Sequence, residues 1–175
     1  LAFSLIKKGE DVSACIVNET QKQVSVEVTV RFLSVDADGK DIASPVSVKQ
    51  DVAPDSMCTA WHCAQKDLPM LDGNEERDNY VIFAEMRSEG GKFADDVLFV
   101  QRWKRYDLPR AVVNAVSGED DNGLYIRLSA ESPAFYVVLD AAGIRGTFSD
   151  NLFTLLPGRE VLVRFTPDDY GWGDG

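Results

Sequence analysis

One stretch near the N-terminus constrains the fold more than any other feature of the chain. From Val24 to Phe32, five apolar side chains alternate with polar ones, in the order V-S-V-E-V-T-V-R-F. A period of two is typical of a β-strand with one buried face and one solvated face. A slip of one residue would expose all five apolar side chains, so the register of this strand is strongly specified.

Shorter segments with the same alternation precede and follow this strand. They span residues 2–6, 12–17, 46–52, 57–61, 80–86 and 97–103. Turn-forming residues separate them, including Asn18-Glu19-Thr20 before the long strand and Gly90-Gly91 before the last one. Only a single turn near residues 68–71 is compatible with a helix. Seven short strands in about 105 residues predict an immunoglobulin-like β-sandwich.

A second unit is predicted after the connector of residues 106–110, where Pro109 restricts Leu108 to extended conformations. Four strands are expected beyond it, at residues 111–117, 124–130, 135–139 and 161–165. Asp121-Asn122-Gly123 predicts a hairpin turn, and Pro157-Gly158 predicts the centre of a type II turn.

The predicted fold class is therefore all-β, with two antiparallel immunoglobulin-like β-sandwich domains in tandem. The expected domains are residues 1–107 and a smaller one at residues 108–175. A domain as small as the second has marginal stability on its own, so we expect it to be stabilised by packing against the first.

Charge and composition exclude several classes of function. The chain has 29 acidic and 18 basic side chains and a formal net charge of -11, so a phosphate backbone would be repelled. No apolar run approaches the ~18 residues of a transmembrane helix. We expect a soluble protein without nucleic acid or membrane as partner, in a compartment that the sequence does not identify. Because the chain begins with Leu1, we also expect it to be part of a longer protein.

Histidine and cysteine are too few for most metal or nucleophilic chemistry. His62 is the one histidine, so sites with several histidine ligands are excluded. Cys58 and Cys63 should face opposite sides of a continuous strand and cannot form a disulfide. Cys58 and His62 would share a face, but about 13 Å of strand separates them, too far for proton transfer. The cysteines, Cys15 included, are expected to be reduced and structural, and no metal or cofactor is predicted.

The many acidic residues raise the question of a pair of catalytic carboxylates. Most of them lie in predicted turns, where solvated charge is the simpler interpretation. Glu27 and Glu85 lie in mid-strand; Glu27 should face water, and Glu85 should be exposed or paired with an arginine. The loop of residues 36–41 fails the spacing of a calcium site, because Lys40 stands where an oxygen ligand belongs. No catalytic residue is assigned.

Two further features have both a functional and a structural interpretation. Asn18-Glu19-Thr20 matches the N-glycosylation acceptor, although a turn explains the same residues. Tyr170 and Trp172 are candidates for stacking on a sugar, although they lie in a Gly-rich tail that could simply fray. Trp61 and Trp103 are expected to end strands and to pack at the edge of a core.

The last third of the chain resembles the last domain of β-mannosidases, which are glycoside hydrolases of family 2. The resemblance rests on V-L-D at residues 138–140, on G-T-F-S-D-N-L-F at residues 146–153, and on the following turn and strand. Phe148 and Phe153 flank the polar step of this segment and should anchor it in the sandwich. The first 105 residues resemble the preceding sandwich domain, through I-V-N-E-T at residues 16–20 and the strand that ends at residues 38–40.

The resemblance implies a part of a longer enzyme. In such enzymes the catalytic glutamates lie on a (β/α)₈ barrel, and this chain has no pattern that could form one. The resemblance therefore implies a non-catalytic accessory region that buttresses the barrel of an enzyme hydrolysing terminal β-mannosides. Its expected partners are that barrel and an oligosaccharide. β-Galactosidases, β-glucuronidases and exo-glucosaminidases share the family and stay open as parents. The alternative is a free-standing carbohydrate-binding or adhesive sandwich module, marked by an exposed row of aromatic side chains.

Overall fold

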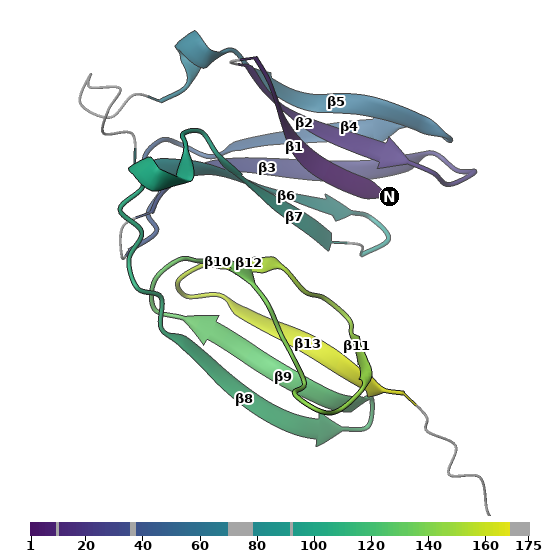
Figure 1. Ribbon diagram of the computed structural model, residues 1–175. Helices are drawn as coiled ribbons and strands as arrows, with labels where there is room; N and C mark the ends of the chain where they lie inside the picture. The colour runs from purple at the N-terminus through teal and green to yellow at the C-terminus, as the bar shows by residue number, and fades with distance from the viewer. Residues whose placement is uncertain (10, 36–37, 70–78, 92, 169–175) are drawn as a thin grey trace, which may run out of the picture. The chain divides into compact units, whose positions relative to one another are not determined.

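The computed structural model describes residues 1–9, 11–35, 38–69, 79–91 and 93–168. Within these ranges the chain is built of antiparallel strands with two short 3₁₀ helices, which confirms the predicted all-β class. Neither of these helices has the length and apolar character needed to cross a bilayer. The chain separates into two compact units, a first unit of residues 1–108 and a second unit of residues 109–175 (Figure 1).

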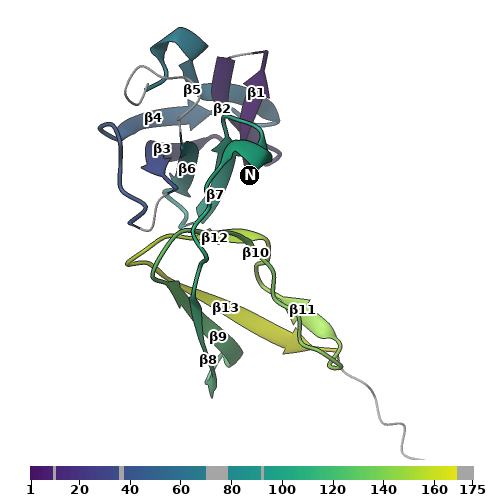
Figure 2. The same cartoon turned by 60° about the vertical axis from the view of Figure 1, so that its left-hand side comes forward.

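Seven strands in two sheets make up the described part of the first unit. Their bounds are β1 Ala2–Lys8, β2 Asp11–Asn18, β3 Val24–Ser34, β4 Val46–Val52, β5 Ser56–Cys63, β6 Tyr80–Ser88 and β7 Phe93–Phe99. The sheets have the orders β1-β2-β5 and β4-β3-β6-β7 and lie face to face (Figures 1 and 2). In a constant-type immunoglobulin domain the fourth strand joins the sheet of the first, second and fifth strands. Here β4 pairs with β3 instead.

Alternating apolar side chains of both sheets meet between them and form the core of the first unit. Val26, Val28 and Val30 of β3 are buried on one side, and Val12 and Ile16 of β2 are buried on the other. The period of two in β3 therefore predicted both the strand and its buried face. Trp61 packs against this core as expected, with its ring 6.2 Å from that of Phe32 and inclined at 63° to it, although β5 continues past it to Cys63.

The strand predicted at residues 97–103 is present, but it begins four residues earlier and already ends at Phe99. β7 begins at Phe93, directly opposite Arg87, because Gly91 adopts φ +80° and closes a tight turn right after β6. Beyond Phe99 the chain enters the 3₁₀ helix η3 (Trp103–Arg105). Trp103 stacks on Phe99 with 3.9 Å between ring centroids, so it lies beyond the strand and does not end it.

The remaining helical element also differs from expectation. The 3₁₀ helix η1 (Gln65–Asp67) precedes the single turn expected at residues 68–71, and that stretch extends beyond the described residues at residue 70. One turn of 3₁₀ helix is too short to produce an apolar stripe, so no sequence pattern could have placed it.

Six described strands make up the second unit. Their bounds are β8 Val113–Asp120, β9 Gly123–Ala130, β10 Ala134–Val137, β11 Gly146–Phe148, β12 Phe153–Leu155 and β13 Glu160–Pro167. A four-stranded sheet has the order β11-β13-β9-β8, and β10 pairs with β12 in a second sheet. The sequence predicted four of these strands; β11 and β12 have 3 residues each, too few for an alternation to be recognised. As predicted, Phe153 is buried and Phe148 packs against the same core.

Both turns predicted in the second unit form. Asp120 pairs with Gly123 across the β8–β9 hairpin, and Gly123 adopts φ +97°. Asp121 and Asn122 both keep negative φ, so this is a right-handed turn followed by a left-handed glycine, rather than a primed turn centred on Asn-Gly. At residues 157–158, Gly158 has φ +74° and the Arg159 N–H donates to the Leu156 carbonyl at 3.1 Å, as in a type II turn.

Candidate functional site

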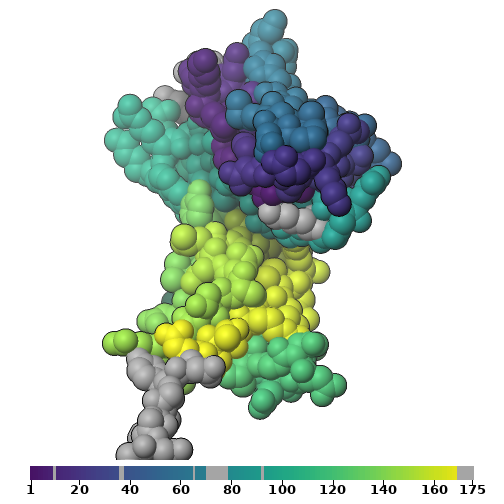
Figure 3. Space-filling view, turned by 90° about the vertical axis from the view of Figure 1, so that its right-hand side faces the viewer, coloured from purple at the N-terminus to yellow at the C-terminus, as the bar shows by residue number. Residues whose placement is uncertain are grey.

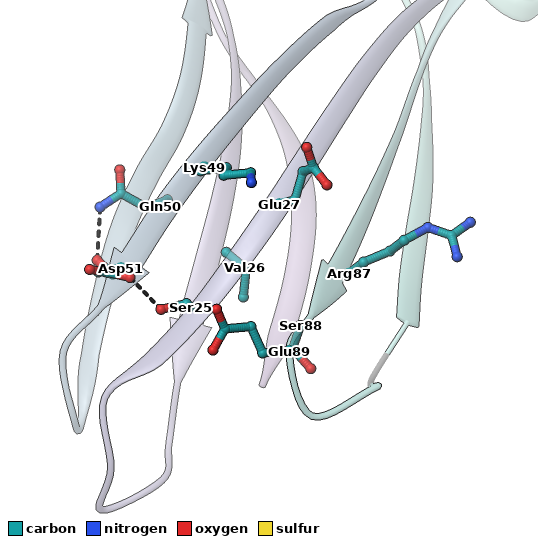
Figure 4. Close-up of a pocket in the computed structure, with 9 residues that line it drawn as sticks. All are labelled: Ser25, Val26, Glu27, Lys49, Gln50, Asp51, Arg87, Ser88 and Glu89. Atoms are coloured by element: carbon teal, nitrogen blue, oxygen red, sulfur yellow. Dashed lines mark hydrogen bonds between the residues drawn. The ribbon is translucent and has the colours of Figure 1, made fainter.

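A hollow of about 440 Å³ lies on the outer face of β4, β3 and β6; we call it the β3 groove (Figure 4). The side chain of Val26 belongs to the core, so those of its neighbours Ser25 and Glu27 project from the opposite, outer face. The groove is lined by Ser25, Val26, Glu27, Lys49, Gln50, Asp51, Arg87, Ser88 and Glu89.

The strand register places charges of alternating sign across the groove. Glu27 lies directly opposite Lys49 of β4 on one side and directly opposite Arg87 of β6 on the other. Directly opposite residues of an antiparallel pair share a face, with Cβ atoms about 4.5–5.5 Å apart. A row of ammonium, carboxylate and guanidinium groups therefore crosses three strands. Glu27 is exposed, as its place in the alternation predicted.

Some groups of the groove are already engaged within the protein. The Ser25 hydroxyl donates to the Asp51 carboxylate, and the Gln50 amide donates to the Asp51 carbonyl at 2.8 Å. The Arg87 guanidinium lies 5.0 Å from the centroid of the Phe93 ring and 3.4 Å from a carboxylate oxygen of Glu85. The prediction that Glu85 is exposed or paired with an arginine is thus confirmed.

Other groups of the groove are uncommitted. Within the described part of the chain, the side chains of Glu27, Lys49 and Glu89 make no hydrogen bond or ion pair. Figure 4 shows Arg87 extending away from Glu27, which opens the space between them. The groove therefore offers free donors and free acceptors side by side on a rigid sheet.

A β-bulge in β5 overturns two predictions about the cysteines. Ala14 pairs with Trp61 and Cys15 with Thr59, so one extra residue of β5 stands between these pairs and reverses the alternation. Cys58 packs against the core, and Cys63 lies opposite buried Val12, so these two cysteines share a face. The expected shared face of Cys58 and His62 is wrong for the same reason.

The cysteines form no disulfide in the structure, and two of them have thiols of lowered reactivity. All three are free thiols. Burial raises the pKa of the Cys58 thiol and that of the Cys63 thiol. A raised pKa lowers the thiolate fraction and with it the reactivity of both groups.

His62 instead lies beside Ser13 and Asp11 on the outer face of the β1-β2-β5 sheet. Its Nδ1 atom is 3.1 Å from the Ser13 hydroxyl, and its Nε2 atom is 4.0 Å from an Asp11 carboxylate oxygen. The residue types are those of a nucleophilic triad. However, the side chains of His62 and Asp11 are 54% and 52% exposed, so water surrounds them. This sheet lies open at the surface of the first unit (Figure 3, purple to blue).

Asn18 has a structural role that excludes its modification in the folded protein. Its side chain is fully buried, and its amide nitrogen donates to the carbonyls of Lys22, Val52 and Ala53 at 2.8–3.1 Å. Its amide oxygen accepts from the N–H and the hydroxyl of Thr20. N-glycosylation would attach a bulky group to that same nitrogen. The turn interpretation of this tripeptide is therefore correct.

The remaining candidate residues are those considered for sugar stacking and for metal binding. Tyr170 and Trp172 lie outside the described residues, as do Asp36 and Ala37 of the loop examined for calcium. Among the residues that the structure describes, no three His, Cys, Asp or Glu side chains gather in a way that could hold a metal ion. Trp103 is 51% exposed, but its ring is stacked on Phe99.

The second unit carries a surface feature that sequence reasoning missed. Leu152 and Tyr136 have φ of +62° and +53°, a left-handed conformation that is strained for bulky side chains, and both are exposed. Val138 and Ile144 are each 64% exposed. The Leu152 N–H donates to the Val137 carbonyl, and the Asn151 side chain bridges to the backbone of Leu139, so Leu152 lies beside the segment that carries Tyr136 and Val138. We call the four apolar residues 136, 138, 144 and 152 the apolar rim. Backbone strain leaves no mark in composition or periodicity.

Comparisons with known proteins assign each unit to a domain family. Residues 10–105 match the family model of the mannosidase Ig/CBM-like domain, and residues 108–174 match that of the mannosidase Ig-fold domain. None of the curated proteins matches the chain. Among solved structures, the chain is similar to the crystal structure of β-D-mannosidase from Dictyoglomus thermophilum, with 15% identity and a TM-score of 0.75.

That similarity covers 94% of this chain and 19% of the mannosidase chain, so this chain spans about a fifth of the length of the protein it matches. At such low identity the structural similarity shows the fold, and the matches to the two family models show family membership. The resemblance to the C-terminal immunoglobulin-like domains of family 2 β-mannosidases is confirmed. The chain belongs to the family of mannosidase Ig/CBM-like domains through its first unit, and its second unit is a mannosidase Ig-fold domain.

Proposed function

We propose that this chain is a non-catalytic accessory region of a β-mannosidase-like glycoside hydrolase, and that it buttresses the catalytic barrel of that enzyme. The observation that carries the proposal is the match of both units, in chain order, to mannosidase domain families. The parent reaction is then the hydrolysis of terminal β-mannosides. The parent's catalytic glutamates lie on the barrel, outside this chain.

The carboxylates of this chain support a non-catalytic role. A glycosidase needs two carboxyl groups at a fixed separation, one of them with its pKa raised by burial. Among the described residues, the buried polar side chains are those of Asn18, Ser132 and Thr154, none of which is a carboxyl group. The pKa of Asp120 is instead lowered, first by its hydrogen bonds from Arg164. That direction is opposite to the one a catalytic acid requires.

The apolar rim is the surface we assign to the barrel contact. A left-handed backbone at a non-glycine residue costs of order 1–3 kcal/mol and persists where the surrounding structure or the function requires it. Leu152 combines this strain with 63% exposure, and Val138 and Ile144 add further exposed apolar surface. Apolar side chains that gather on a surface mark a contact with another body.

The substitution Leu152→Asn tests this assignment. Asparagine tolerates the left-handed region, so the isolated 175-residue chain should keep its stability or gain up to about 1 kcal/mol. In the longer polypeptide that includes the barrel, the same change removes an apolar contact. There it should lower the melting temperature by several degrees and reduce turnover of an aryl β-mannoside. Calorimetry and a chromogenic assay measure both.

Met57→Asn is the matched control, because Met57 is an equally exposed apolar residue of the first unit, at 70% exposure. It should change neither quantity by much. If Leu152→Asn destabilises the isolated chain as strongly as the longer polypeptide, the rim packs within this chain and contacts no barrel. If the longer polypeptide does not hydrolyse β-mannosides at all, the proposed parent activity is wrong.

A further inference from the structure

We propose that the β3 groove binds a neutral oligosaccharide. The proposal uses only side chains of the first unit. It does not depend on the barrel contact proposed above, which uses the second unit.

The uncommitted groups of the groove match the chemistry of sugar hydroxyls. A hydroxyl group donates one hydrogen bond and accepts up to two. Glu27 and Glu89 offer free carboxylates that accept, while the Lys49 ammonium and the outward edge of the Arg87 guanidinium donate. Neighbouring hydroxyls of one sugar ring can therefore bond to a carboxylate and to a cation at once. Such charge-assisted hydrogen bonds are roughly twice as strong as neutral ones.

The charge pattern favours a neutral ligand over an ion. Cationic Lys49 and Arg87 flank the carboxylate of Glu27, and the carboxylates of Asp51 and Glu89 lie in the next row. An anion would meet these carboxylates and a protein of net charge -11, while a cation would meet the two basic groups. A ligand with many hydroxyls and no net charge avoids both repulsions.

The apolar surface near Arg87 and the size of the groove also suit a sugar. Phe93, which is 38% exposed, lies beneath the guanidinium of Arg87, one of the residues that line the groove. The arginine stem and the ring edge offer apolar surface to the C–H face of a pyranose. The volume of about 440 Å³ falls within the range of roughly 300–1,000 Å³ of small-molecule sites. Because the lining acids and bases are exposed, the affinity should be weak, with a Kd of about 1–10 mM.

Titration of the ¹⁵N-labelled 175-residue chain with mannotriose, followed by amide chemical shifts, tests the proposal. The largest shift changes should fall on residues 25–27, 49–51 and 87–89. Glu27→Gln keeps the shape of the side chain but removes its charge, and it should raise the Kd at least about fivefold. Glu131→Gln, an exposed glutamate in a turn of the second unit, is the matched control and should leave the Kd unchanged. The dispersion of each spectrum reports whether the variant is folded.

Several results would overturn the proposal. These are no saturable shifts up to about 50 mM sugar, shifts centred outside the groove, or equal binding by the wild type and Glu27→Gln. Stronger shifts with sodium acetate or with a lysine-rich peptide than with mannotriose would assign the groove to an ion or to a protein partner instead. A negative titration would leave the Leu152→Asn experiment unaffected, so the two proposals can fail separately.

Discussion

The two units of this chain are both β-sandwiches, yet different features stabilise the fold of each unit. In its described part, the first unit packs two sheets of 3 and 4 strands around a core cluster of 13 buried residues. Among the described residues of the second unit, a four-stranded sheet is accompanied by a sheet of two short strands, and the core cluster has 6 buried residues. Burial of apolar area is the main favourable term in folding. The second unit, with its smaller core, should therefore have a smaller free energy of unfolding.

The units also differ in where their polar anchors lie. In the first unit Asn18 is fully buried and ties three strand ends together through backbone carbonyls. In the second unit the anchors are at the surface: Asn151 bonds both backbone groups of Leu139, and Ser149 bonds both backbone groups of Arg164. A side chain thus replaces ladder hydrogen bonds where the strands are too short to make them.

Removal of one core phenylalanine from each unit should expose the difference most strongly. Phe153→Ala and Phe32→Ala delete side chains that are equally buried, with 6% and 5% exposure. Each should cost about 3–5 kcal/mol of unfolding free energy. The second unit should lose most of its folded population with Phe153→Ala, while the first unit should stay folded with Phe32→Ala. Urea titration followed by amide spectra measures both. A loss below about 1 kcal/mol for Phe153→Ala would contradict the small-core account.

The two asparagine anchors give a smaller and unequal pair of effects. Asn18→Ala removes the partner of the buried Val52 carbonyl and of partly buried groups of Thr20, Lys22 and Ala53, and it should cost about 2–4 kcal/mol. Asn151→Ala exposes its former partners to water and should cost about 0.5–1.5 kcal/mol. Thermal and urea unfolding of both variants measures the difference. Equal losses would mean that burial does not distinguish these anchors.

The smallest effect is expected from acid. Hydrogen bonds from Arg164, and one from the Asn122 N–H, hold the pKa of Asp120 below its ordinary value. A carboxyl group with a lowered folded pKa stabilises the fold above its unfolded pKa and loses this contribution as pH falls through the folded pKa. Below about pH 4 the second unit should therefore lose a little stability. Asp120→Asn should lose the same contribution already at pH 7 and show a flatter acid dependence in urea unfolding. An identical pH profile for both proteins would rule this out.

Alternation predicts a strand most clearly where one face lies against the core and the other faces solvent. Val24 to Phe32 is the clearest case, and every residue expected to face inward there is at least partly buried. The start of β7 was missed because its adjacent Asp95 and Asp96 break the alternation, and β12 was missed because its three residues are all buried and show no alternation. The bulge in β5 could not be read from the sequence, since it is defined only by the partner strand.

The candidate sites were less accessible to sequence reasoning. Glu27 was correctly placed in water, but its groove arises from the register with Lys49 and Arg87, which one strand alone does not define. The cluster of Ser13 and His62 likewise depends on the pairing of β2 with β5. Leu152 is apolar and unremarkable in sequence, and only its backbone conformation marks it out.

The central proposal is that this chain supports the catalysis of a longer enzyme and does not perform it. The most direct test is an assay of an aryl β-mannoside with three samples at equal concentration: the purified 175-residue chain, the longer polypeptide with its barrel, and that polypeptide without this region. We expect no turnover above the buffer rate from the chain alone, turnover from the longer polypeptide, and lower activity and melting temperature when this region is removed. Turnover by the chain alone that disappears when one of its own carboxylates is replaced would contradict the account.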